Sequence, residues 1–73
     1  MIMNKVYQNT EPGPIPVYAD SSKSQQIGRL FARSSCLCIG EQEGLAIVLY
    51  KTNVNVPNVF KVGFVDAAGM QQG

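Results

Sequence analysis

Cys36 and Cys38 are the residues of this sequence whose type and spacing come closest to a recognisable chemistry. Side chains alternate along an extended strand, so this spacing places both sulfur atoms on one face. Reduced cysteines packed in a core are the first interpretation, because free cysteine behaves as a small hydrophobe. A zinc site is the second, and only a symmetric dimer could complete its four thiolates. A disulfide within the pair would be strained, which leaves intermolecular or redox chemistry as the third.

Histidine is absent from all 73 residues. Its absence removes the commonest general base, the commonest metal ligand and every Ser-His or Cys-His nucleophile. Carboxylates in predicted loops or turns are normally solvated rather than paired as acid and base, and here they are Asp20, Glu41, Glu43 and Asp66. No glycine pattern forms a phosphate-binding loop. Apart from the dimeric zinc alternative, we expect no catalytic residue, no metal and no cofactor.

The charged residues are few and scattered along the chain. Six basic and five acidic residues give a net charge of +1, and charged residues make up 15% of the sequence, where about a quarter is usual. Scattered cations do not form the basic stripe that nucleic acids require, so we expect no nucleic-acid binding. Poorly screened apolar surface favours self-association or a protein partner.

The sequence has neither an apolar run long enough to span a bilayer nor a signal peptide at its start. We therefore expect no membrane association and a cytoplasmic location for the chain as given. A domain excised from a larger secreted protein would look the same, and its location would then be extracellular.

Three prolines lie within five positions, at Pro12, Pro14 and Pro16. Proline excludes helix and sheet interior, so residues 1–16 are predicted to form an irregular arm and residues 17–73 the folded domain. The arm is interpreted as a stiff linker, with a polyproline II ligand for another module as the alternative.

Short β-prone runs alternate with turn-rich stretches after the arm, which indicates an all-β barrel or sandwich. The predicted strands are residues 17–19, 27–32, 36–41, 45–52 and 60–65. Five strands joined by short loops leave little room for a helix.

The strand predicted over residues 45–50 is apolar on both faces. Leu45, Ile47 and Leu49 point one way, and the alternate residues Ala46, Val48 and Tyr50 point the other. One face of a small barrel strand meets the core, so the other must meet the chain's own arm, another subunit or a ligand.

Aromatic side chains offer candidates for a groove. Phe60 and Phe64 alternate with smaller or polar residues in the last predicted strand and are interpreted as core. Tyr18 and Tyr50 are the candidates for the groove, because a tyrosine combines apolar contact with a hydroxyl that prefers a polar partner. A half-buried structural role is the alternative for both.

Three short motifs follow one another in a characteristic order: Val17-Tyr18-Ala19, Ile27-Gly28-Arg29-Leu30 and Gly63-Phe64-Val65. With the strands between them, they resemble the bacterial Src homology 3-like (SH3-like) domain family over about three quarters of the chain. The resemblance implies a barrel of about five strands that serves as a binding module for cell-wall peptide or a protein partner. The tryptophans usual in that family are absent, with Tyr50 and Phe64 near their places, and the loop over residues 53–58 is longer than usual.

We therefore expect a non-catalytic interaction module of the SH3-like kind that binds a peptide or protein partner. Its predicted contact residues are Tyr18, Tyr50, Ile47 and Leu49, with the loops that follow residues 17–19 and Lys51. The alternative is a small structural protein, of a kind that a phage or mobile element encodes, which self-assembles through the apolar strand 45–50.

Overall fold

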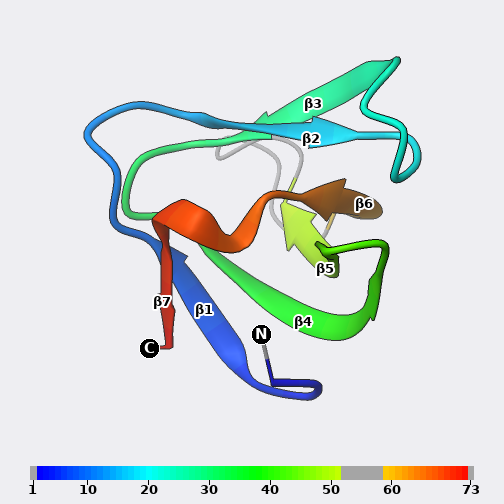
Figure 1. Ribbon diagram of the computed structural model, residues 1–73. Coiled ribbons are helices and arrows are strands. Elements are labelled where there is room, and N and C mark those ends of the chain that lie inside the picture. Colours follow the sequence, from blue (N-terminus) through cyan, green and yellow to red (C-terminus); the bar gives the residue numbers. More distant parts are fainter. Residues whose placement is uncertain (1, 52–58, 73) are drawn as a thin grey trace.

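The computed structural model describes residues 2–51 and 59–72. Within these residues the fold is all-β, with one antiparallel sheet in the order β3-β2-β6-β5-β4-β1-β7. The sheet curls so that β2 and β3 lie across from β1 and β4, and it encloses the core between them (Figure 1). The strands are β1 (Val6–Asn9), β2 (Ile15–Tyr18), β3 (Gln26–Leu30), β4 (Ser35–Gln42), β5 (Leu45–Lys51), β6 (Phe60–Val65) and β7 (Met70–Gln72).

The prediction of an irregular arm over residues 1–16 is wrong, because β1 and the first half of β2 lie within that range. Tyr7 and Ile15 from this segment are buried in the core. Pro16 is compatible with β2 because that strand pairs with β6 only at Tyr18, so no ladder bond from Pro16 toward β6 is needed. With β1 and β7 added, the prediction of about five strands is also wrong.

The buried side chain of Asn9 holds the proline-rich connection against the sheet. Its Nδ2 donates to the carbonyl oxygens of Gly13 (3.0 Å) and Leu30 (2.9 Å), and its Oδ1 accepts from the Glu11 amide (2.9 Å). Asn9 is 0% exposed, so these bonds replace water at every polar atom of the amide. The segment is therefore ordered by a polar anchor, despite its prolines.

A two-residue turn joins β4 to β5. Gln42 pairs with Leu45, and the intervening Glu43 and Gly44 both have positive φ, at 52° and 83°. Positive φ at both central positions is the type I′ geometry that matches the twist of adjoining strands. A bulge between Cys38 and Gly40 accommodates one extra residue in β4.

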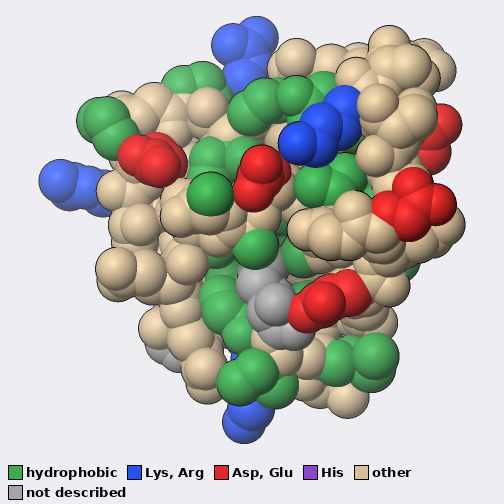
Figure 2. All heavy atoms as spheres, in the orientation of Figure 1, with side chains coloured by type: hydrophobic (Ala, Val, Ile, Leu, Met, Phe, Trp, Pro, Cys, Tyr) green, Lys and Arg blue, Asp and Glu red, His purple; other side chains and the backbone are tan. Residues whose placement is uncertain are grey.

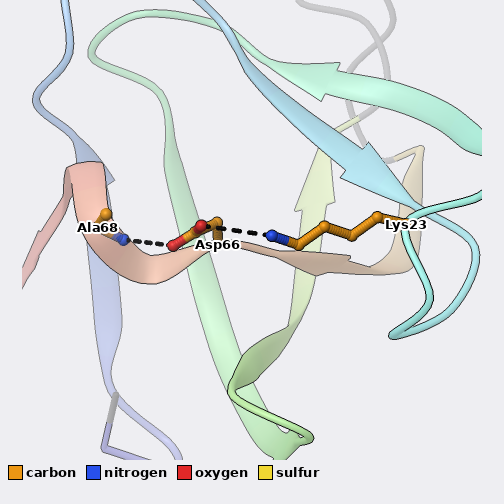
Figure 3. Close-up of polar contacts among 3 residues, drawn as sticks. All are labelled: Lys23, Asp66 and Ala68. Atoms are coloured by element: carbon orange, nitrogen blue, oxygen red, sulfur yellow. Dashed lines mark hydrogen bonds and ion pairs between the residues drawn. The ribbon is translucent and has the colours of Figure 1, made fainter.

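A short 3₁₀ helix, η1 (Ala67–Gly69), connects β6 to β7. Asp66 caps it by accepting a hydrogen bond from the Ala68 amide (3.1 Å), and the same carboxylate lies 3.6 Å from the Lys23 ammonium (Figure 3). In the described part of the chain, no helix has the length and apolar character needed to cross a membrane.

Both cysteines are free and buried in the core, where they pack beside aliphatic side chains. Cys38 Sγ donates to the Gly40 carbonyl oxygen at 3.5 Å. Burial raises the pKa of the Cys36 thiol to about 11, with a further contribution from neighbouring Cys38. The structure thus agrees with the interpretation of Cys36 and Cys38 as reduced cysteines packed in the core.

The ring of Tyr50 lies in the interior between two glycines, Gly28 on β3 and Gly63 on β6. A Cβ added at Gly28 would lie 2.7 Å from the Tyr50 hydroxyl oxygen, and one added at Gly63 would collide with Val17 Cγ1. The Gly63 Cβ position is also 3.4 Å from the Tyr50 ring. The glycines of the Ile-Gly-x-Leu and Gly-Phe-Val motifs are thus explained by the space that Tyr50 and Val17 occupy.

Candidate partner-binding surface

The two faces of β5 lie in different environments. Ala46, Val48 and Tyr50 point into the core and are 2%, 0% and 1% exposed. Ile47 and Leu49 point to the opposite side and are only half-buried. Curling of the sheet encloses the first face, so the second lies on the outside of the curl.

An apolar row crosses four neighbouring strands on this outer side. The sheet register aligns Val6 with Leu37, Leu37 with Leu49, and Leu49 with Val62. The two ends of the row are the most open, since Val6 is 47% and Val62 51% exposed. Further apolar residues flank it on the same faces of β5 and β6. We call the set the outer face: Val6, Leu37, Ile47, Leu49, Phe60, Val62 and Phe64.

The prediction that Phe60 and Phe64 belong to the core is wrong. Phe60 is 51% exposed and Phe64 is half-buried, whereas the alternate residues Gly63 and Val65 face the interior. The interior beside Gly63 is filled by Val17 and the Tyr50 ring, and no larger side chain fits there. The strand therefore turns its glycine inward and its two phenylalanines outward.

Two adjoining hollows form a groove at one end of the outer face. The larger, of about 380 Å³, is lined by Leu30, Phe31 and Ser34, and the second, of about 300 Å³, by Val6, Leu37 and Leu49 among others. Three residues line both hollows: Ser35, Lys51 and Phe60. Cavities of this size are within the range that small ligands or anchoring side chains occupy. We call the two hollows together the groove.

Among the described residues that line the groove, Lys51 is the one whose side chain is charged at neutral pH. It makes no ion pair with any described residue. A second cation is near, because the Arg29 guanidinium lies 5.9 Å from the ring centre of Phe31. The groove therefore combines apolar walls with an unpaired positive charge.

No acidic side chain is among the described residues that line the groove. Figure 2 shows acidic side chains spread over the side that faces the viewer, while most basic side chains seen there project from the rim. Several have partners within the chain: Asp20 accepts from Ser22 (2.5 Å), Glu43 from Ser21 (2.9 Å), and Asp66 lies beside Lys23. Carboxylates of the chain are thus engaged away from the groove.

The edge strand β3 is a second place where a partner could attach, because unpaired edges are templates for strand addition. Two of its carbonyl groups already accept side-chain protons, Gly28 from Gln26 Nε2 (3.1 Å) and Leu30 from Asn9 Nδ2 (2.9 Å). These bonds compete with an incoming strand. The outer face is the better candidate for a contact surface.

Of the four predicted contact residues, two line the groove, one lies beside it and one lies apart from it. Leu49 lines the groove, and Ile47 lies beside it on the outer face. Tyr18 pairs with Phe64 at the β2–β6 junction and is among the lining residues of neither hollow. Tyr50 is among the residues that line the second hollow, but it is 1% exposed and its ring fills the interior, so it offers the groove little side-chain surface.

Two loops were predicted to contribute to the contact surface, the one after residues 17–19 and the one after Lys51. The turn after β2 is held by local bonds: Ser22 Oγ and Ser24 Oγ are hydrogen-bonded at 2.8 Å, and the Ala19 amide donates to the Gln25 carbonyl oxygen (2.9 Å). The loop that follows Lys51 lies outside the described residues. The residues that sequence reasoning missed are Val6, Lys51, Phe60 and Val62, and inward-facing Gly63 is the signal that could have revealed the two on β6.

The perturbed titratable groups belong to the interior. Burial raises the pKa of Tyr50, as it does that of Cys36, and the Tyr50 hydroxyl has no hydrogen-bond partner among the described residues. Both shifts therefore reflect core packing. Within the same residues, no group of three or more Cys, Asp or Glu side chains is arranged to hold a metal ion.

The chain was also compared with known proteins. Compared with models of protein families, with curated proteins and with solved structures, it matches none of them.

Proposed function

We propose that this chain is a non-catalytic interaction module that binds a protein or peptide partner through the outer face and its groove. The observation that carries the proposal is the apolar row Val6–Leu37–Leu49–Val62, which runs unbroken across β1, β4, β5 and β6. Soluble monomers rarely expose a large contiguous apolar surface, and where one occurs it usually marks an interaction site.

The energetics favour a partner on this face. Val62 and Phe60 are each 51% exposed, and covering the remaining surface of such side chains contributes roughly 1 kcal/mol apiece. Their burial requires no unfolding, because the core on the other side of the sheet is already filled. The aromatic ring of Phe60 is also of the type that anchors interfaces.

The resemblance to bacterial SH3-like domains supports the same class of function. Those domains bind peptides or proteins, cell-wall peptide among them, and the curled antiparallel sheet of this chain is compatible with a module of that kind. The contact surface proposed here rests on Leu49, Phe60 and Val62, and does not use Tyr50.

Self-assembly through β5 is a second candidate, favoured by the position of Ile47 and Leu49 on the outer face. Face-to-face packing of two copies would bring two Lys51 side chains to one interface, and neither groove lining supplies a carboxylate. Like charges oppose this arrangement. Light scattering over a range of concentrations decides between the two: a stable oligomer in reductant would favour self-assembly, and a monomer the partner.

Photo-crosslinking in the producing cell tests the proposal. A benzophenone amino acid replaces Val62 on the outer face, and in a matched variant it replaces Gln71, an exposed residue of β7. We expect covalent adducts from position 62 and none from position 71. Mass spectrometry of the adducts identifies the partner, and absence of adducts at position 62 would contradict the proposed contact surface.

A further inference from the structure

We propose that the groove recognises a peptide segment in which a carboxylate lies between bulky apolar side chains. This inference rests on the proposed function, and it names the chemistry of the partner segment. Its carboxylate would lie against Lys51, and its apolar side chains would enter the two hollows on either side.

The position of Lys51 carries the first step. Lys51 is an exposed residue that lines both hollows, so its long side chain can place the ammonium beside either of them. It has no ion-pair partner among the described residues. A ligand with an anion at this point would gain a solvent-accessible ion pair that a neutral ligand would lack. The occupant that gains most therefore carries a negative group here.

The walls of the groove carry the second step. Phe31 and Leu30 line one hollow, Leu49 and Leu37 the other, and Phe60 lies between them. Apolar walls on both sides of a single cation match an anion flanked by apolar groups. The occupant is therefore an acidic residue with a bulky apolar neighbour on each side.

The small number of charges at the groove favours an acidic peptide over nucleic acid or a second copy of the chain. Among the described residues that line the groove, Lys51 is the single cation, and Arg29 lies over the lining residue Phe31. Nucleic acid would require several cations arranged along a backbone. A second copy would have to supply a carboxylate, and three of the five acidic side chains, Asp20, Glu43 and Asp66, already have partners within the chain. A single carboxylate from a partner peptide fits the site best.

A titration followed by NMR tests the inference with two probes, acetyl-Leu-Glu-Phe-amide and acetyl-Leu-Gln-Phe-amide. They differ only in the charge of the central residue. With the Glu probe we expect saturable shifts of the backbone amides of Ser35, Leu49 and Phe60. With the Gln probe we expect roughly three- to five-fold weaker binding, the size of a solvent-accessible ion pair.

Two lysine variants make the test specific. Lys51→Met keeps most of the apolar stem and removes the charge, so we expect it to bind both probes equally. Lys61→Met is the matched control, because Lys61 is exposed on β6 but lines neither hollow, and it should keep the preference for Glu.

Equal affinity of the wild-type protein for both probes, or no shift at these amides up to about 10 mM probe, would overturn the inference. If adducts still formed at position 62, the interaction module would stand and only the chemistry of its partner would be wrong. If adducts identified a second copy of the chain, the peptide inference would fail in favour of self-assembly. Absence of adducts would reject the proposed function itself.

Discussion

The two faces of β5 differ in what fixes their residues. On the inner face, Tyr50 fits between Gly28 and Gly63 with no room for a further methyl group. On the outer face, Leu49 is half-buried and its neighbour Val62 is exposed, so their contacts within the chain leave apolar surface uncovered. The inner face is therefore fixed by the requirements of folding, whereas the outer face is the contact surface that we propose for a partner. We therefore expect substitutions in the interior to lower stability, and substitutions on the outer face to weaken partner binding with little change in stability.

Asn9 should show the largest loss of stability. Asn9→Ala removes three hydrogen bonds and leaves the Leu30 and Gly13 carbonyls without this donor, so we expect the free energy of unfolding to fall by about 3 kcal/mol. Urea denaturation followed by circular dichroism measures the change. Gln8→Ala is the control, since the exposed Gln8 makes one surface bond to Arg33, and it should change stability by less than about 0.5 kcal/mol. Equal losses for both would contradict the anchoring role of Asn9.

Gly63 should follow. Gly63→Ala forces a methyl group into Val17, and overpacking of this kind costs about 2 kcal/mol. Gly69→Ala is the matched control, because the atoms that its methyl group would meet belong to the flexible side chain of Glu11. Thermal unfolding should show a clear drop in Tm for the first variant and a small change for the second. The account of the inner face would be wrong if the order were reversed.

Alkaline pH should weaken the fold through Cys36. Its thiol has a pKa of about 11 in the folded chain, against an ordinary value of 9.0, so the unfolded state loses its proton first as the pH rises. The stabilising contribution is complete below pH 9 and is lost as the pH rises through 11. Unfolding in urea across this range, compared with Cys36→Ala, should show a steeper decline in the wild type. Parallel curves would refute the linkage.

Tyr50→Phe should leave stability unchanged or raise it by up to about 1 kcal/mol. The substitution removes a buried hydroxyl that has no partner among the described residues, while it keeps the ring. The control is Tyr7→Phe, because the Tyr7 hydroxyl accepts a bond from the Ile2 amide (2.6 Å) and its loss should be mildly destabilising. A large loss in Tyr50→Phe would show that the hydroxyl has a partner.

Much of the sheet could be predicted from the chain. Residues predicted as strands over 36–41 and 60–65 fall within β4 and β6, because β-branched and apolar runs bounded by turn residues are local signals. The alternation over Leu45 to Tyr50 also predicted two distinct faces. All-β architecture follows from such local patterns.

The N-terminal segment was not predictable in the same way. Pro12 and Pro14 mark a break in regular structure, but the order of the segment comes from Asn9, whose partners Gly13 and Leu30 are brought to it by the tertiary fold. A buried asparagine in a polar, proline-rich stretch leaves no periodic signal. Local propensity was therefore overridden by one non-local anchor.

The inward face of β6 was likewise set by a distant residue. Large apolar residues alternate with smaller or polar ones in this strand, and such alternation normally predicts that the apolar side, here Phe60 and Phe64, faces the core. The ring of Tyr50 and the side chain of Val17 occupy that space, which only Gly63 can approach. The contact surface consequently contains Phe60 and Val62, which sequence reasoning assigned elsewhere or left aside.

The most direct test of the division between the two faces combines Val62→Gln with the crosslinking probe moved to position 60. Val62 is exposed and its loss removes apolar contact without adding charge, so we expect the Tm to stay within a few degrees while adducts from position 60 decrease severalfold. Ile27→Gln on β3 is the control, since Ile27 is 37% exposed and lies outside the outer face, and it should leave adducts unchanged. Unchanged adducts in Val62→Gln, or unfolding of that variant, would contradict the claim that the outer face binds a partner and is dispensable for folding.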